Sequence, residues 1–151
     1  MNDPAFTVLL CDRLNRSRVE PQQLCVEITV TAAVAHLTKA SELLWAKGVR
    51  FTLDDFGSGI SSFGYIKALQ VDYLKTDGDV VRDIGTDPQD RVLVVAIHNI
   101  GCAMGMAAVV ECVEEDSETL PKVIGVNYAQ GFGIAPPPSS AEVAVSRLGV
   151  F

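Results

Sequence analysis

The chain has 151 residues, of which 48% are hydrophobic and 21% are charged, a composition typical of one globular domain with its own core. Its formal net charge of −7 argues against binding to nucleic acid polymers, which requires a basic surface. The sequence has no apolar stretch long enough to span a bilayer and no opening signal peptide, so we expect a cytoplasmic protein with no membrane segment.

Helical and strand patterns alternate along the chain. In order, the patterns predict a helix of about three turns that starts near Pro4, a strand over 24–29, a helix over 31–47, a strand over 49–53, a short helix over 61–68, a strand over 71–74, a helix over 90–104, a strand over 107–110, a helix over 115–123, a strand over 126–129 and a last helix over 140–148. The strands are short and almost entirely apolar. This alternation predicts a parallel sheet whose outer face is covered by helices, in a single domain over 1–151.

Polar side chains follow the predicted strands at the points where those strands end. They are Glu27, Asp54, Asp55, Lys75, Asp77, Glu111, Glu114 and Gln130. The carboxyl ends of parallel strands meet at one mouth, and in a (β/α) barrel that mouth carries the active site. Several carboxylates gathered there repel one another unless a cation lies between them, and hard divalent ions favour such oxygen-rich sites.

The tandem Asp54-Asp55 and the isolated Lys75 suggest a specific chemistry. Two adjacent acids can bridge two metal ions where the chain bends, and two-metal sites stabilise in-line phosphoryl displacement. A lysine among carboxylates can hold the attacking water or offset charge in the transition state. Each residue alone also has an ordinary interpretation as a cap, a turn or a surface charge. An enolase-like barrel, with acids that hold Mg²⁺ and a lysine base, is an alternative at this point.

The cysteines and histidines give weaker signals. Cys11, Cys25, Cys102 and Cys112 contain no C-x-x-C spacing, so we expect reduced and mostly buried thiols. His36 and His98 lie on helical stretches, and neither is expected to be a metal ligand because no partner is evident at ligand spacing.

Several segments together resemble the EAL domain, the metal-dependent phosphodiesterase of cyclic di-GMP. They are Val26-Glu27-Ile28-Thr29, Leu53-Asp54-Asp55-Phe56-Gly57-Ser58-Gly59, Leu74-Lys75-Thr76-Asp77, Glu111-Cys112-Val113-Glu114 and Ala129-Gln130-Gly131-Phe132. The resemblance implies a TIM-type barrel that hydrolyses cyclic di-GMP to pGpG with Mg²⁺ or Mn²⁺. It implies that Glu27, Asp54, Asp55 and Glu111 bind metal, that Lys75 and Asp77 position or activate water, that Glu114 acts through bound water and that Gln130 lines the substrate site.

The chain also departs from the family pattern. The Glu-Ala-Leu segment and the asparagine of the next strand are absent, Val30 stands in place of a usual glutamate, and Cys112 in place of a usual glycine. The resemblance therefore implies an incomplete barrel, about the last two thirds of an EAL domain, with impaired activity. A module that binds cyclic di-GMP or a protein without turnover is the alternative. We expect the open barrel to pair with a second copy, or with missing N-terminal strands and a GGDEF or sensor domain.

Overall fold

The computed structural model describes residues 4–36, 39–57, 66–67, 69–114 and 120–138. In this part of the chain the strands are β1 (Cys25–Thr29), β2 (Arg50–Phe56), β3 (Tyr73–Thr76), β4 (Ala107–Val110) and β5 (Tyr128–Ala129). They form one sheet in the order β1-β2-β3-β4-β5, and every neighbouring pair is parallel. The predicted α/β class is confirmed. Because β1 and β5 are the two edges of this sheet, the described strands form an open sheet.

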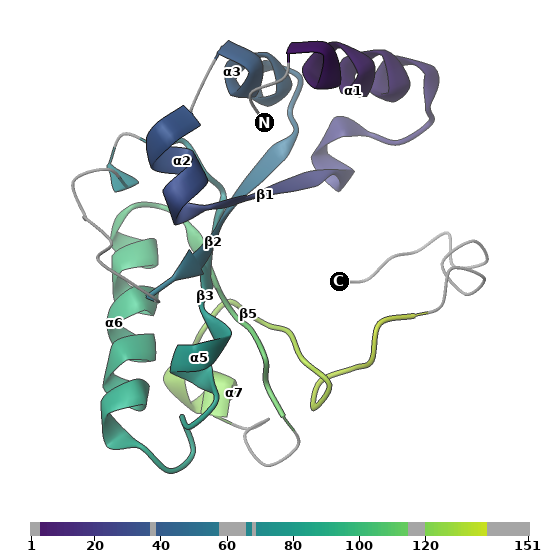
Figure 1. Cartoon of the computed structure of the whole chain (residues 1–151). Coiled ribbons are helices and arrows are strands. Elements are labelled where there is room, and N and C mark those ends of the chain that lie inside the picture. The colour runs from purple at the N-terminus through teal and green to yellow at the C-terminus, as the bar shows by residue number, and fades with distance from the viewer. Residues whose placement is uncertain (1–3, 37–38, 58–65, 68, 115–119, 139–151) are drawn as a thin grey trace.

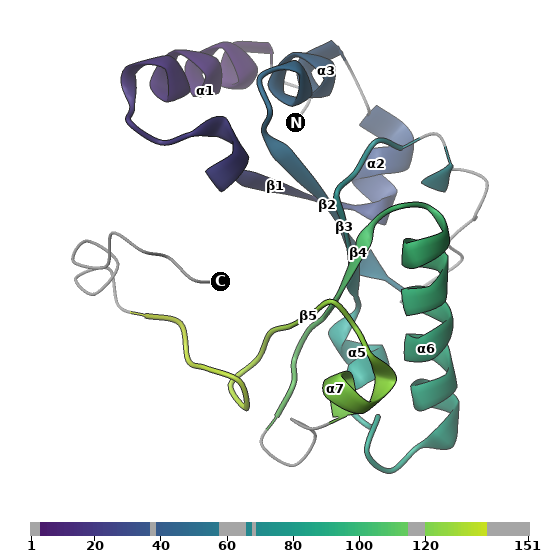
Figure 2. The same cartoon turned by 180° about the vertical axis from the view of Figure 1, so that it is seen from behind.

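The helices pack beside this sheet. They are α1 (Pro4–Arg16), the 3₁₀ turn η1 (Pro21–Gln23), α2 (Val30–His36), α3 (Lys39–Ala46), α5 (Gly78–Val81), α6 (Pro88–Ala103) and α7 (Leu120–Ile124). Helix α2 packs on β1 and β2, and α6 packs on β3 and β4. Both views show α2 and α6 on one side of the sheet, while the segment that follows β5 runs across the other side (Figures 1 and 2). One face of the sheet is therefore covered by helices, as the apolar strands predicted.

The element boundaries differ from the sequence prediction in three places. The single helix expected over 31–47 is two helices, α2 and α3. Strand β2 continues to Phe56 and β3 to Thr76, so Asp54 and Lys75 lie inside strands and not after them. Helix α5 was not predicted. The predictions over 61–65, 115–119 and 140–148 fall outside the described residues.

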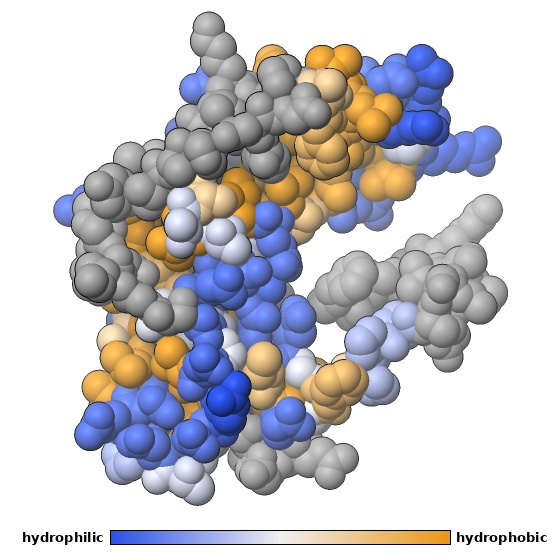
Figure 3. Space-filling view, in the orientation of Figure 1, coloured by the Kyte–Doolittle hydropathy of each residue, from blue (hydrophilic) through white to orange (hydrophobic). Residues whose placement is uncertain are grey.

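The core consists of two groups of buried apolar side chains. The larger group joins β1, β2 and β3 to α3 and α6, and it includes Phe51, Leu53 and Leu74. The smaller group joins α5 to α6 and β4 through Val81, Val94 and Val110. Apolar surface is also exposed at the top of the molecule over α3 and the adjoining part of α1, and hydrophilic surface covers much of the middle (Figure 3). The described helices include none that is long and apolar enough to cross a membrane.

Candidate active site

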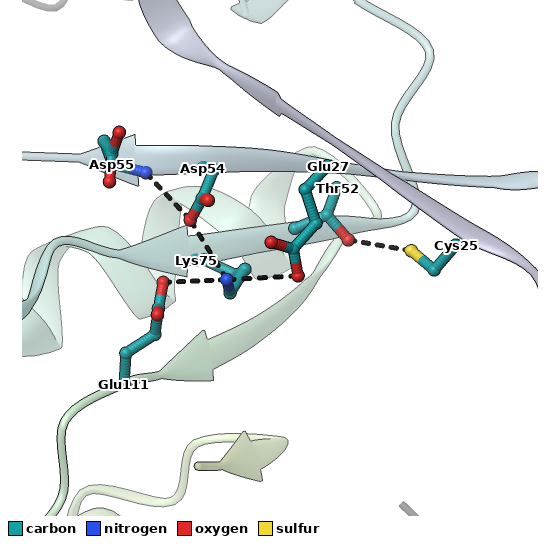
Figure 4. A network of polar contacts seen from close by, with 7 residues as sticks. All are labelled: Cys25, Glu27, Thr52, Asp54, Asp55, Lys75 and Glu111. Atoms are coloured by element: carbon teal, nitrogen blue, oxygen red, sulfur yellow. Dashed lines mark hydrogen bonds and ion pairs between the residues drawn. The ribbon is translucent and has the colours of Figure 1, made fainter. Parts of the chain in front are cut away.

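A buried lysine lies at the centre of the candidate site. Lys75 is part of β3, and its ammonium Nζ lies 3.1 Å from Glu27 Oε1, 3.2 Å from Asp54 Oδ1 and 3.1 Å from Glu111 Oε1. These three carboxylates come from β1, β2 and the residue directly after β4, and they point at the ammonium from different sides (Figure 4). We call these four residues the lysine cluster. Residues distant in the sequence thus meet at one point of the sheet, as the positions of the strand-end acids predicted.

The alternation of side chains along each strand explains this convergence. Leu74 is fully buried in the core, so Lys75 points to the opposite face of the sheet. Strands β1 and β2 pair in parallel, with Thr29 opposite Asp54. Glu27 lies two residues before Thr29, so its side chain is on the same face of the sheet and next to β2. Lys75 pairs with Val109, two residues before Glu111. The register is regular at these two pairs, and the four charged side chains share one face of the sheet.

Asp55 adopts a different conformation from its neighbour. Its backbone has φ 57°, in the left-handed region, and the β2–β3 register shifts between Leu53 and Phe56. The backbone N–H of Asp55 donates a hydrogen bond of 3.1 Å to Asp54 Oδ1. The predicted bend in the chain therefore lies at Asp55 itself as well as at Gly57, which has φ 111°. As a result the Asp55 carboxylate points away from Lys75 (Figure 4).

The charge of Lys75 is stabilised by its partners. Burial of the ammonium favours the neutral amine, but the hydrogen bonds from Lys75 to Glu111 and Glu27 outweigh burial and raise the pKa of Lys75 above its ordinary value. Lys75 is only 5% exposed and the side chains of Asp54 and Glu111 are also mostly buried, so solvent screens these two contacts weakly, whereas the Glu27 side chain is half exposed. The ammonium is therefore a fixed positive charge at neutral pH.

The carboxylates of the cluster outnumber the ammonium by three to one, and the excess negative charge affects their protonation. Burial, followed by a hydrogen bond with Asp54, raises the pKa of Glu111 to about 7. For Asp54 burial acts in the same direction, but hydrogen bonds from Glu111 and Lys75 outweigh it and hold the pKa of Asp54 below its ordinary value. Asp54 is therefore the ionised member of this pair, and Glu111 holds a proton up to near neutrality.

The remaining predicted site residues lie around the cluster with separate contacts. The Asp77 side chain caps α5 by accepting a 2.7 Å hydrogen bond from the Asp79 N–H. Glu114 is exposed in the segment after β4. Gln130 is exposed, and its backbone joins the end of β5 to Val110 and Val113 at 2.8 and 3.1 Å. The structure thus gathers Glu27, Asp54, Lys75 and Glu111 into one cluster, whereas the roles expected of Asp55, Asp77, Glu114 and Gln130 stay predictions.

A glycine sets how closely the end of β5 approaches the segment after β4. A Cβ on Gly131 would lie 2.3 Å from the backbone N and O of Val113, a distance that no side chain tolerates. Gly131 therefore allows Gln130 to lie beside the residues that follow Glu111. This packing explains why the sequence has glycine directly after Gln130.

Sequence reasoning missed a polar contact next to the cluster. Cys25 Sγ and Thr52 Oγ1 are 2.9 Å apart, and these residues precede Glu27 and Asp54 by two positions on the same face (Figure 4). The period-two alternation of strands could have placed them there. The prediction of mostly buried thiols is wrong, because Cys25, Cys102 and Cys112 are exposed and Cys11 is partly exposed, although all four are free as expected. Cys25 is part of the edge strand β1, Cys11 and Cys102 lie on helices α1 and α6, and Cys112 follows β4.

The atoms of the cluster suit a divalent cation in kind and in charge. Carboxylate oxygens are the ligands that Mg²⁺ and Mn²⁺ prefer, and three carboxylates around one ammonium leave uncompensated negative charge. In this geometry the three carboxylates contact the lysine. Within the described residues no three His, Cys, Asp or Glu side chains are grouped so as to hold a metal ion. The kind and charge of the donor atoms suit such an ion, but in this geometry the lysine occupies the point where the acids converge.

Comparison with known proteins identifies the family of the chain. The protein-family model for the EAL domain matches residues 1–137. The chain is 39% identical over 124 residues to the cyclic di-GMP phosphodiesterase PdeB of Shewanella oneidensis, an alignment that covers 79% of this chain and 14% of PdeB. The chain therefore spans a small part of this curated relative.

In comparisons with solved structures, this chain covers a larger share of the matched protein than it does of PdeB. The EAL domain of Mycobacterium smegmatis DcpA matches with a TM-score of 0.86 and 28% identity, over 96% of this chain and 66% of that one. A manganese and cyclic di-GMP complex of Klebsiella pneumoniae BlrP1 matches with a TM-score of 0.77 and 27% identity, over 87% of this chain and 34% of that one. The open parallel sheet is thus part of a TIM-type barrel, and the chain belongs to the EAL domain family.

Proposed function

We propose that the domain to which this chain belongs hydrolyses one phosphodiester bond of cyclic di-GMP to give linear pGpG, with Mg²⁺ or Mn²⁺, and that this chain retains the central part of its site. The observation that carries the proposal is the Lys75 ammonium held by three strand-end carboxylates within 3.2 Å. PdeB is named as a cyclic di-GMP phosphodiesterase, and BlrP1 is known in complex with manganese and cyclic di-GMP, so these two relatives support the same substrate and ion.

Each residue of the cluster has a role that its contacts suit. A bound Mg²⁺ or Mn²⁺ would polarise the phosphodiester and make a bound water more acidic. Glu27, Asp54 and Glu111 would hold it, with Asp55 adjacent, because they supply the oxygen ligands at the ends of the strands. Since its partners keep Lys75 protonated, its ammonium would orient the attacking water and offset charge on the phosphoryl oxygens.

Three residues outside the cluster complete the proposal. Asp77 follows β3 two residues after Lys75 and would help to position the water. Glu114 would act through a bound water, and Gln130 would line the substrate site, since both are exposed at the ends of β4 and β5. In the reaction the water oxygen attacks phosphorus, the bond from phosphorus to one 3′ oxygen breaks, and that oxygen takes up a proton.

The test is cleavage of cyclic di-GMP by the chain in excess over substrate with Mn²⁺, followed by chromatographic detection of pGpG. We expect cleavage that disappears in Asp54→Ala. Asp83→Ala is the matched control, because Asp83 is an exposed acid whose side chain lies outside the cluster. Equal cleavage by the chain and by Asp54→Ala would sink the proposal, since the product would then come from a contaminant.

A second function, binding without turnover, is supported by the departures from the family pattern, including Val30 and Cys112. It predicts that labelled cyclic di-GMP binds the chain while no pGpG forms. In that case Asp54→Ala changes affinity only. The enolase-like alternative is disfavoured by membership of the EAL family.

A further inference from the structure

Helix α6 carries a histidine and a cysteine that lie side by side. His98 and Cys102 are four residues apart, which puts them on the same face of a helix one turn from each other. Cys102 Sγ lies 3.7 Å from His98 Nε2 and 3.8 Å from His98 Nδ1. Cys102 is exposed and His98 is partly exposed. The expectation that His98 has no partner at ligand spacing is therefore wrong.

The separation of these atoms matches the coordination shell of zinc. Tetrahedral zinc has bonds of about 2.3 Å to sulfur and about 2.1 Å to nitrogen, which places those two ligand atoms about 3.6 Å apart. Cys102 Sγ lies almost equally far from both ring nitrogens of His98, so the imidazole and thiol must rotate about their side-chain bonds before one nitrogen lone pair and the sulfur can face the same ion. Ligands at i and i+4 of a helix reach a common zinc ion by such rotations while the helix backbone stays in place. We propose that His98 and Cys102 bind one Zn²⁺-type ion through imidazole nitrogen and thiolate sulfur.

The position of the pair on α6 also favours a cation. The helix ends at Ala103, so both residues lie in its last two turns. The carbonyl groups at the C-terminus of a helix carry partial negative charge and stabilise a nearby cation. The same i, i+4 spacing on a helix places two zinc ligands in the H-E-x-x-H motif. Geometry and helix electrostatics thus point to the same kind of ligand.

This site is separate from the lysine cluster. A Cβ at Gly101, between His98 and Cys102 in sequence, would lie 3.6 Å from Leu74 Cδ2, so this part of α6 packs on the face of β3 opposite to Lys75. The ligand chemistry differs as well, because sulfur and imidazole select zinc-type ions whereas carboxylates select Mg²⁺ and Mn²⁺. The inference therefore does not depend on the proposed function.

Binding is a simple exchange of a proton for a metal ion. The Sγ–H bond of Cys102 breaks as the bond from sulfur to the metal forms, and the proton passes to the buffer. The imidazole donates a nitrogen lone pair without losing a proton. The described residues provide no third His, Cys, Asp or Glu at this point, so water molecules complete the coordination. An ion held by two side chains exchanges readily, unlike a closed structural zinc site.

The test uses a variant in which Cys102 is the sole thiol, with Cys11, Cys25 and Cys112 replaced by serine. Titration with Cd²⁺ is followed by the thiolate-to-metal charge-transfer band, which carboxylates do not produce. We expect saturation at one ion per chain, displacement of Cd²⁺ by Zn²⁺, no band in Cys102→Ser, and affinity lower by at least about tenfold in His98→Ala. Equal affinity in His98→Ala would overturn the proposal, because the thiol would then bind alone.

A relocated histidine provides the matched control. The double variant His98→Ala with Ala96→His keeps the composition of the sole-thiol chain and moves the imidazole to an exposed position six residues from Cys102, on another face of α6. It should bind as weakly as His98→Ala, and full affinity in this variant would contradict the proposed geometry. An affinity that rises with protein concentration would also overturn the one-chain site, since two copies would then share the ion.

A second measurement uses the chain with all its cysteines, in case the serine replacements disturb folding. Alkylation of each cysteine by iodoacetamide is followed by peptide mass spectrometry with and without Zn²⁺. We expect Zn²⁺ to slow the modification of Cys102 at least about tenfold, and to slow it less in His98→Ala. Modification of Cys102 at the same rate with and without Zn²⁺ would overturn the proposal.

Discussion

The two faces of β3 carry side chains of opposite character. Leu74 is 0% exposed and Lys75 is 5% exposed, so both side chains are removed from water to a similar extent. Leu74 is surrounded by apolar groups of the core, among them Met106, and Lys75 by three carboxylates. Apolar contacts do not depend on pH, but a charged cluster depends on which of its members is protonated. One strand thus contributes to stability on one face and to the candidate chemistry on the other.

The largest expected effect is on the apolar face. Leu74→Ala should lower the free energy of unfolding by about 2–5 kcal/mol, because it removes buried methyl groups and leaves a cavity beside Gly101. The loss should be the same at pH 5 and pH 8 in urea denaturation. Val92→Ala is the control, since Val92 is 66% exposed on α6, and it should change stability by less than about 0.5 kcal/mol. A loss for Leu74→Ala that depends strongly on pH would show that the two faces are coupled.

The second effect is on the charged face. Lys75→Met should lower the free energy of unfolding by about 2–3 kcal/mol at pH 8, since it leaves three carboxylates without their cation. The loss should shrink at pH 5, where Glu111 is protonated. Lys67→Met, at an exposed lysine, should have little effect at either pH. If Lys75→Met costs the same at both pH values, the comparison between the two faces fails.

The unmodified chain should show the pH dependence of Glu111 directly. Its pKa is raised from 4.5 to about 7, so the folded state binds a proton more tightly than the unfolded state does. The stability from this group is complete below pH 4.5 and is lost as the pH rises to 7. We expect it to amount to about 1–2 kcal/mol, measured as the difference between the chain and Glu111→Gln at each pH. A difference that grows in the opposite direction would show that Glu111 is ionised in the folded protein at pH 5.

The convergence of the cluster could be predicted from the sequence because it follows from two general rules. Carboxyl ends of successive parallel strands lie together, and side chains alternate along each strand. These rules place Glu27, Asp54, Lys75 and Glu111 on one face without any knowledge of tertiary contacts. The predicted positions of the strand ends were less accurate, because a polar residue inside a strand gives the same sequence pattern as a polar residue directly after it.

Other features depend on contacts that a sequence pattern does not contain. Helix α5 is four residues long, too short for a helical period to emerge. The exposure of Cys25, Cys102 and Cys112 depends on which layers cover them in three dimensions. The proximity of His98 and Cys102 follows from their i, i+4 spacing on one helix, a pattern that is neither a C-x-x-C pair nor a strand-end acid.

The smallest predicted effect separates structure from chemistry at Asp77. Its side chain caps α5, so Asp77→Ala should lower stability by about 0.5–1 kcal/mol, whereas Asp77→Asn should keep the cap and the stability. Asp87 caps α6 in the same way, through a 2.7 Å hydrogen bond from the Gln89 N–H, and provides matched variants away from the cluster. If Asp77 also positions water, Asp77→Asn should lose cleavage of cyclic di-GMP at unchanged stability, and Asp87→Asn should lose neither. Full activity of Asp77→Asn would mean that Asp77 serves the fold alone, and that the charged face of β3 carries its chemistry through the lysine cluster without it.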